Sequence, residues 1–248
     1  MNALARAAGK LRGIMGSIGS NLQEVKQRIA AACATSARDV NSVTLLAVSK
    51  TFAAAAVREA HAAGACAFGE NYVQEALAKI EALADLRAQL EWHLIGPLQS
   101  NKTRPVAAAF DWVQTVQHLK VAERLAEQRP AHLPPLNLCL QVNVSGEASK
   151  SGVAAKELPA LAAAVATLPA QRVRLRGLMA IPAPTDDAVA QRRQHRELRR
   201  LFERLREEGH ALDTLSAGMS SDLEAAVAEG STMVRVGSAI FGRRDSTP

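Results

Sequence analysis

The sequence predicts an α/β protein, a single (β/α)8 barrel of the TIM type with an extra N-terminal helix. Eight short apolar segments lack the polar alternation of a half-exposed sheet, and segments of helical periodicity separate them. Such runs are typical of parallel strands covered on both faces, and eight of them match a closed barrel. The 248 residues also fit one barrel, for which about 250 residues is typical. A doubly wound open sheet is the alternative.

Cap and turn residues divide the chain into these elements. Ser20 with Gln23, or Asn21 with Glu24, has capping-box spacing and predicts the start of the extra helix. The predicted strands are 43–49, 65–69, 91–95, 111–115, 136–144, 174–179, 212–216 and 232–236. The predicted helices between them are 54–63, 72–89, a short helix opening at Pro105, 118–128, 156–167, 187–208 and 221–229.

No linker or break in composition divides the chain, so we expect one domain over residues 16–248. Residues 1–15 carry Arg6, Lys10 and Arg12 but no acidic residue, and we expect them to form a poorly ordered extension. No apolar segment approaches the roughly 18 residues that a membrane-spanning helix needs. The sequence therefore predicts no membrane partner.

Composition and charge argue against nucleic-acid partners and indicate a reducing compartment. Aromatic residues make up only 3% of the chain, which argues against base-stacking surfaces for single-stranded nucleic acids. The one dense arginine group, within 192–200, alternates with glutamates on a predicted helix, so we interpret it as a solvated face and expect no nucleic-acid partner. Cys33, Cys66 and Cys139 lie far apart in apolar surroundings. This is typical of thiols in a reducing compartment, without disulfides or zinc, and predicts a cytoplasmic protein.

Polar residues gather where the predicted strands end. In a (β/α)8 barrel the functional residues come from the loops at the carboxyl ends of the strands. Lys50 follows the first strand, Asn71 follows the second, and Met179 ends the sixth. A lysine at a strand end ordinarily extends its amine into water, so Lys50 alone predicts little.

The loops after the last two strands have the composition of a phosphate site. In SAGMSSD, Ser220 follows a glycine turn, and Ser221 has capping-box spacing to Glu224. In RVGSAIFG, Gly237 and Ser238 allow close approach of the backbone. Each loop alone is ordinarily a plain helix cap or turn. Because barrels often bind phosphate between these two loops, their combination favours an anion site.

A lysine beside a phosphate site indicates pyridoxal 5'-phosphate (PLP), held as a Schiff base. Strand one neighbours strand eight in a closed barrel, so Lys50 is expected beside the phosphate loops. The reactive form is the neutral amine, which burial and a nearby cation such as Arg235 favour. Arg235 lies two residues before Gly237 on the same strand face and is expected at the pyridine nitrogen. An ion pair with a carboxylate is the ordinary alternative for this arginine.

Seven motifs occur in a fixed order along the chain. They are LLAVSK, FGENYVQE, WHLIGPLQSNK, QVNVSGEASKSG, RGLMAIP, LSAGMSSD and RVGSAIFG. Over about residues 20–244 the sequence thereby resembles the pyridoxal phosphate homeostasis protein family, also called the YggS or proline synthase co-transcribed family. One departure is Ala217, where we expect a methionine from the family pattern.

The resemblance implies a single barrel like the amino-terminal domain of alanine racemase, with Lys50 carrying PLP. It implies phosphate contacts from Ser220 and from the backbone of Gly237 and Ser238, with Arg235 at the ring nitrogen. The matching motifs also assign three residues to the pocket lining. These are Asn71, Met179 and Ser216.

The sequence favours a carrier over an enzyme. Racemisation of the alanine type needs a base on each face of the α-carbon, and the second base is ordinarily a tyrosine from a further domain that we do not expect here. Tyr72 and His93 are the remaining candidates, and a histidine near a strand end is more often a hydrogen-bonded structural residue. The leading hypothesis is a non-catalytic protein that holds PLP reversibly in intracellular PLP homeostasis.

Several functional alternatives stay open from the sequence. A PLP-dependent racemase, or a barrel that binds another phosphorylated metabolite without a covalent bond, competes with the carrier hypothesis. PLP-dependent apoenzymes are the expected recipients of the cofactor, and a monomer is expected because one barrel completes the pocket. Lys102 and Lys150 are candidates for a second, weaker PLP site.

Overall fold

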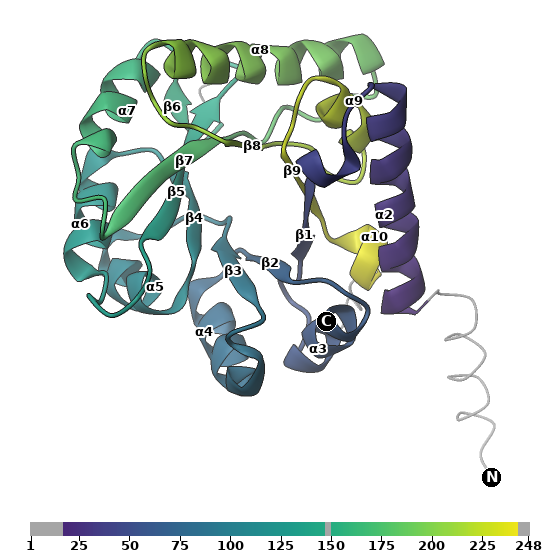
Figure 1. The fold of residues 1–248 in the computed structure, drawn as a ribbon, viewed down its shortest axis with the longest axis horizontal. Coiled ribbons are helices and arrows are strands. Elements are labelled where there is room, and N and C mark those ends of the chain that lie inside the picture. Colours follow the sequence, from purple (N-terminus) through teal and green to yellow (C-terminus); the bar gives the residue numbers. More distant parts are fainter. Residues whose placement is uncertain (1–16, 147–149, 243–248) are drawn as a thin grey trace.

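The computed structural model describes residues 17–146 and 150–242, so the predicted extension at residues 1–15 lies outside the described residues. Eight parallel strands close into a barrel with helices around its outside, which confirms the predicted fold class (Figure 1). The ring of strands is complete, because β4 (Trp112–Val116) pairs with β5 (Leu136–Asn143) and the first strand, β1 (Thr44–Val48), pairs with the last, β9 (Met233–Val236). The barrel strands are β1 (Thr44–Val48), β2 (Ala67–Glu70), β3 (Glu91–Leu94), β4 (Trp112–Val116), β5 (Leu136–Asn143), β7 (Val173–Met179), β8 (Thr214–Ser216) and β9 (Met233–Val236).

The described helices follow the predicted alternation, because each presents an apolar stripe to the sheet. They are α2 (Ile18–Thr35), α3 (Ala54–Ala62), α4 (Val73–Ala82), α5 (Thr103–Ala109), α6 (Leu119–Gln128), α7 (Leu158–Ala166), α8 (Ala188–Glu207), α9 (Leu223–Ala228) and α10 (Ser238–Phe241). Three 3-10 turns lie at Val40–Ser42, Ala84–Leu86 and Ser100–Lys102, and the two-residue strand β6 (Val153–Ala154) pairs with the end of β5. The sequence predicted neither β6 nor α10.

Helix α2 is the extra helix, and it covers the side of the barrel where the first and last strands meet. It runs beside α9 and α10 (Figure 1). The Asn21 side chain donates to the Ile240 carbonyl at 2.9 Å, and Arg28 pairs with Glu224 at 2.9 Å. Its apolar face, including Leu22 and Ile29, is buried. The N-terminal part of the domain thus holds the C-terminal part in place.

Two helix boundaries differ most from the prediction. The cap of α2 is Ser17, whose hydroxyl accepts from the Ser20 N–H at 3.1 Å, so the helix begins earlier than Ser20 or Asn21 predicted. The helix predicted over 72–89 ends at Ala82. Leu83 turns into the core there, with 1% of its surface exposed, and a 3-10 turn follows. Burial of one leucine overrides the helical propensity of the segment after it.

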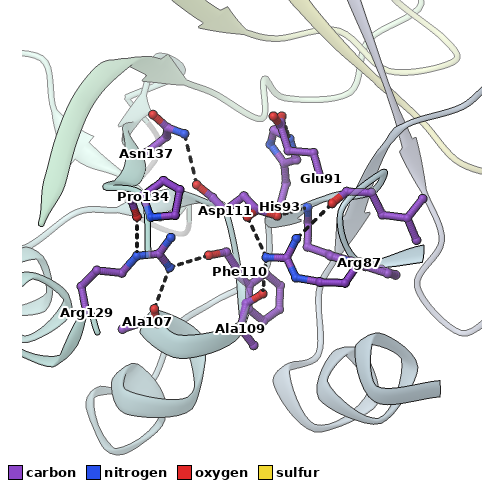
Figure 2. A network of polar contacts seen from close by, with 12 residues as sticks. Arg87, Glu91, His93, Ala107, Ala109, Phe110, Asp111, Arg129, Pro134 and Asn137 are labelled. Carbon is purple, nitrogen blue, oxygen red and sulfur yellow. Dashed lines mark hydrogen bonds and ion pairs between the residues drawn. The ribbon is translucent and has the colours of Figure 1, made fainter. Parts of the chain in front are cut away.

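A polar network closes the amino end of the barrel between β3, β4 and β5 (Figure 2). Arg87 pairs with Asp111 at 2.7 Å, and the second Asp111 oxygen accepts from the Trp92 N–H at 2.8 Å. The buried guanidinium of Arg129 donates to three backbone carbonyls, those of Ala107, Phe110 and Pro134. These bonds satisfy backbone groups that water does not reach. This end of the barrel therefore serves stability, which leaves the carboxyl end for binding.

The close contact between β7 and β8 predicts that one methyl group added at Gly177 strongly destabilises the protein. A Cβ at Gly177 would lie 1.6 Å from the Thr214 carbonyl oxygen, so Gly177→Ala must push the two strands apart. We expect Gly177→Ala to lower the free energy of unfolding by about 3 kcal/mol or more in urea denaturation. Gly19→Ala is the control, because its Cβ meets only ordinary contacts of 3.5 Å or longer at the start of α2. This variant is expected to keep or slightly raise stability. Equal stability of the two variants would contradict the strand geometry.

Candidate cofactor site

One cavity of about 660 Å³ opens at the carboxyl ends of the first and last barrel strands. Its walls come from β1, from the loops after β1, β2, β3, β7 and β8, and from the end of β9 with the start of α10. Apolar side chains, among them Phe52, Ile95 and Ile181, form one part of the wall. Six of the eight sequence-predicted site residues also line it. They are Lys50, Asn71, Ser220, Arg235, Gly237 and Ser238.

The other two predicted site residues are not among those that line this cavity. Met179 is fully buried and packs with Trp112 and Cys139 inside the barrel. Ser216 is also fully buried, and its hydroxyl accepts from Arg235 Nη1 at 2.8 Å. Both strand-end side chains are therefore buried in the interior and are not exposed on the cavity wall. Ala217, which departs from the family pattern, packs in the core as well.

Arg235 lies at the bottom of the cavity, held by uncharged partners. Its guanidinium donates to the Ser216 hydroxyl and, through Nη2, to the Ala180 carbonyl at 2.8 Å. Within the described residues no carboxylate forms an ion pair with it, so the ordinary explanation of a strand-end arginine does not apply. Burial lowers the pKa of Arg235 to about 10, and the Asp222 charge opposes that shift. The side chain is still protonated at neutral pH.

A chain of hydrogen bonds runs from Arg235 through the barrel interior to its amino end. The Ser216 hydroxyl donates to Gln114 Oε1 at 2.7 Å, and Gln114 Nε2 lies 2.9 Å from His93 Nδ1. The other ring nitrogen, His93 Nε2, lies 2.7 Å from Glu91 Oε1. Both nitrogens of this buried histidine are therefore engaged. His93 is not among the residues that line the cavity, and its role is to support the interior network.

Lys50 reaches the cavity from a strained turn directly after β1. Its side chain is half-buried, and the next residue, Thr51, has a φ of 69°. The left-handed region costs a β-branched residue roughly 1–3 kcal/mol, so the surrounding structure must hold this turn. Gly237 packs closely against the end of β1, because a Cβ there would lie 3.2 Å from the Val48 carbonyl oxygen.

The loop after β8 is folded by Asp222 and not by the predicted capping box. Helix α9 begins after Asp222, and Glu224 pairs with Arg28 instead of capping with Ser221. One Asp222 oxygen accepts from the Met219 N–H at 2.6 Å, and the other lies 2.9 Å from His195 Nε2. This arrangement leaves Ser220 and Ser221 on the cavity wall.

Sequence reasoning missed the apolar wall and the supports of the site. Phe52 follows the first predicted strand and Ile95 is the last residue of the third, and an apolar residue at a carboxyl strand end was the available signal for them. The pairing of Asp222 with His195 joins residues 27 positions apart, and no local pattern indicates it.

Known proteins resemble this chain in sequence and in fold. The family model described as "Alanine racemase, N-terminal domain" matches residues 20–245. The pyridoxal phosphate homeostasis protein of Pseudomonas aeruginosa is 61% identical, over 93% of this chain and 97% of that protein. Its Escherichia coli K12 counterpart is 54% identical, over 93% of this chain and 98% of that protein. The chain belongs to the pyridoxal phosphate homeostasis protein family. The family that the seven motifs indicated is thereby confirmed.

Solved structures agree with the family assignment. PipY of Synechococcus elongatus, a structure with PLP bound, is 38% identical with a TM-score of 0.80, over 91% of this chain and 100% of PipY. Alanine racemase of Corynebacterium glutamicum, at 19% identity and a TM-score of 0.70 over 93% of this chain and 63% of that one, shares the fold. Across residues 17–146 and 150–242, no helix combines the length and apolarity needed to cross a membrane. The same residues contain no cluster of three or more His, Cys, Asp or Glu side chains suited to a metal ion.

The Asp222 contacts predict an acid-dependent part of the stability. Burial favours the neutral carboxyl, but the hydrogen bonds from His195 and the Met219 N–H outweigh burial, so the pKa of Asp222 is lowered from 3.8. A lowered pKa stabilises the folded state above the unfolded pKa, and this contribution disappears as the pH falls through the folded value. Between about pH 5 and about pH 3, the free energy of unfolding should fall in both proteins. In Asp222→Asn it should fall by about 1 kcal/mol less than in the unsubstituted protein.

Urea titrations at several pH values measure this difference. Exposed Asp186, changed to Asn, is the control and should follow the unsubstituted protein. If Asp222→Asn shows the same fall in stability as that control, the Asp222 carboxylate does not hold the loop.

Proposed function

We propose that this chain binds PLP in the cavity, with its aldehyde joined to Lys50 Nζ as a reversible imine. The observation that carries the proposal is the meeting of Lys50, Arg235 and the serine and glycine turns in a single cavity. The cavity volume of about 660 Å³ lies within the usual range for small-ligand sites, about 300–1,000 Å³. The bound PLP of PipY and the names of the curated relatives support the same ligand.

The donor set of the cavity fits the chemistry of the cofactor. Hydroxyls of Ser220, Ser221 and Ser238 and the open backbone at Gly237 suit a phosphate. Asn71 Oδ1 is buried without a hydrogen-bond partner among the described residues, so a donor from a ligand would complete it. These groups lie in the same cavity as Lys50. The residues present thus fit PLP at its aldehyde and phosphate ends.

The role proposed for Arg235 is to face the pyridine nitrogen. PLP supplies an aldehyde that condenses with amines and a ring that accepts electrons best when its nitrogen is protonated. A guanidinium does not give up its proton near neutral pH, so it donates a hydrogen bond and leaves the nitrogen unprotonated. The Ser216 and Ala180 contacts hold the guanidinium in that orientation. A weak electron sink suits a protein that holds the cofactor.

The titratable side chains that line the cavity favour a protein that holds PLP over an amino-acid racemase. Lys50 and Arg235 are the only titratable side chains among the described residues that line it. Tyr72 is 54% exposed outside the cavity, and His93 is buried beneath it. A second base for the opposite face of an α-carbon is therefore missing from the wall. We propose a non-catalytic role in intracellular PLP homeostasis, and a PLP-dependent amino-acid racemase is the alternative.

The partners proposed for this role are PLP itself and PLP-dependent apoenzymes that receive it in the cytoplasm. A monomer is proposed, since the described cavity is built from one chain. Lys102 and Lys150 are not among the residues that line this cavity, so any PLP that they bind occupies a separate, weaker position.

Loss of the lysine amine tests the covalent step. The protein incubated with PLP is expected to develop a visible absorbance band, and borohydride reduction followed by peptide mapping should place the added mass on Lys50. Lys50→Ala should lack both signals because no other amine lines the cavity. Lys102→Ala is the control and should keep both. Racemisation of an amino acid at roughly 10 per second, abolished by Lys50→Ala, would instead establish the enzyme.

Removal of one serine hydroxyl tests the phosphate end. A hydrogen bond to a charged group contributes about 1.5–3 kcal/mol, so Ser220→Ala should weaken PLP binding about 10- to 100-fold. Equilibrium titration measures the dissociation constant. Ser36→Ala, a change at the far end of α2, is the control. An unchanged constant for Ser220→Ala would place the phosphate elsewhere.

A further inference from the structure

A buried ion-paired cluster lies directly beneath Lys50, and the proposed binding role does not use it. Lys79 of α4 and Glu70 at the end of β2 are almost fully buried, and Nζ lies 2.5 Å from Glu70 Oε1. The Ser49 hydroxyl donates to the same Glu70 oxygen at 2.6 Å. Burial raises the pKa of the Glu70 carboxyl, while Lys79 opposes the shift. Charged groups in such a place carry a desolvation cost, and a buried pair is a weak source of stability.

The cluster bonds to the backbone on both sides of Lys50. Lys79 Nζ donates to the Ser49 carbonyl at 2.8 Å, one residue before Lys50. Glu75 Oε1 accepts from the Thr51 N–H at 2.6 Å, one residue after it. Both side chains project from α4, and they contact each other at 3.1 Å. Helix α4 therefore holds the two peptide groups that flank Lys50, including the one at the left-handed turn.

The same contacts occupy the second amine near the cavity. A lysine ammonium has three N–H donors. Those of Lys79 are directed at the Ser49 carbonyl, at Glu70 and at Glu75. An ammonium bonded in this way has no lone pair with which to attack an aldehyde.

We propose that Lys79, Glu70 and Glu75 are positioning residues that aim Lys50 into the cavity and keep Lys79 itself unreactive. The inference rests on the proposed PLP binding for its chemical consequence. Its structural part, the fixed backbone at residues 49–51, stands on the contacts alone. In this arrangement the FGENYVQE segment contributes to the site through Glu70 and Glu75 as well as through Asn71.

Glu75 allows a test by graded substitution, because its side chain is only partly buried. Glu75→Ala removes the acceptor of the Thr51 N–H, whereas Glu75→Gln keeps an oxygen in the same place. Glu81→Ala is the matched control, an exposed glutamate on the same helix without a role in the cluster. Urea denaturation measures the free energy of unfolding of each variant, so an effect on the position of Lys50 can be distinguished from a general loss of stability.

The first measurement is amide hydrogen exchange of the protein without added PLP. Exchange at Thr51 should be at least about 10-fold faster in Glu75→Ala, and close to that of the unsubstituted protein in Glu75→Gln and Glu81→Ala. If exchange at Thr51 is unchanged in Glu75→Ala, then α4 does not hold the backbone at residues 49–51, whether or not the protein binds PLP.

The second measurement is the rate at which the visible PLP band appears. Misplacement of the amine should slow attachment about 10-fold in Glu75→Ala, with most of the rate restored in Glu75→Gln. Reduction and peptide mapping should find the adduct on Lys50 and none on Lys79. A Glu75→Ala protein that exchanges faster at Thr51 but binds at the normal rate overturns the positioning role. If the unsubstituted protein does not bind PLP, the proposed function is rejected. The exchange measurement still decides whether α4 holds the backbone at residues 49–51.

Discussion

The pairing of β1 with β9 is the constraint on which the site depends. Leu46 lies beside Arg235, and Ala47 beside Val236, although almost 190 positions separate these residues in sequence. Parallel pairing brings both carboxyl ends to the same edge, so the lysine after β1 and the glycine after β9 share one cavity. The α2 contacts to α9 and α10 cover this junction from outside. An open sheet would separate the same residues and leave no site.

The sequence predicted this arrangement because barrel closure follows from a count of strands. Eight apolar runs without polar alternation are enough to specify eight covered parallel strands, and strand order then makes the first and last neighbours. Lys50, Gly237 and Ser238 line the cavity, and the change from apolar to polar residues at the strand ends is the signal that singled them out in the sequence. Alternation along β9 placed Arg235 on the same face as Gly237.

Features set by tertiary contacts escaped prediction. Ser216 and Met179 stand at strand ends like Lys50, but their side chains turn into the barrel interior, and a strand end alone does not specify which layer a side chain joins. The end of α4 depends on the burial of Leu83, and the loop before α9 depends on His195 from another helix. Thr51 adopts the left-handed backbone conformation, which a glycine at this position would have indicated in the sequence. Support for Lys50 is therefore the least predictable part of the site.

A crystal structure of the protein soaked with PLP and reduced with borohydride tests the central claim most directly. We expect continuous density from Lys50 Nζ to the pyridine ring, with Arg235 at the ring nitrogen and the phosphate against Ser220, Gly237 and Ser238. Density for the phosphate at another face of the barrel, or a Lys50 side chain directed away from these turns, would contradict the account.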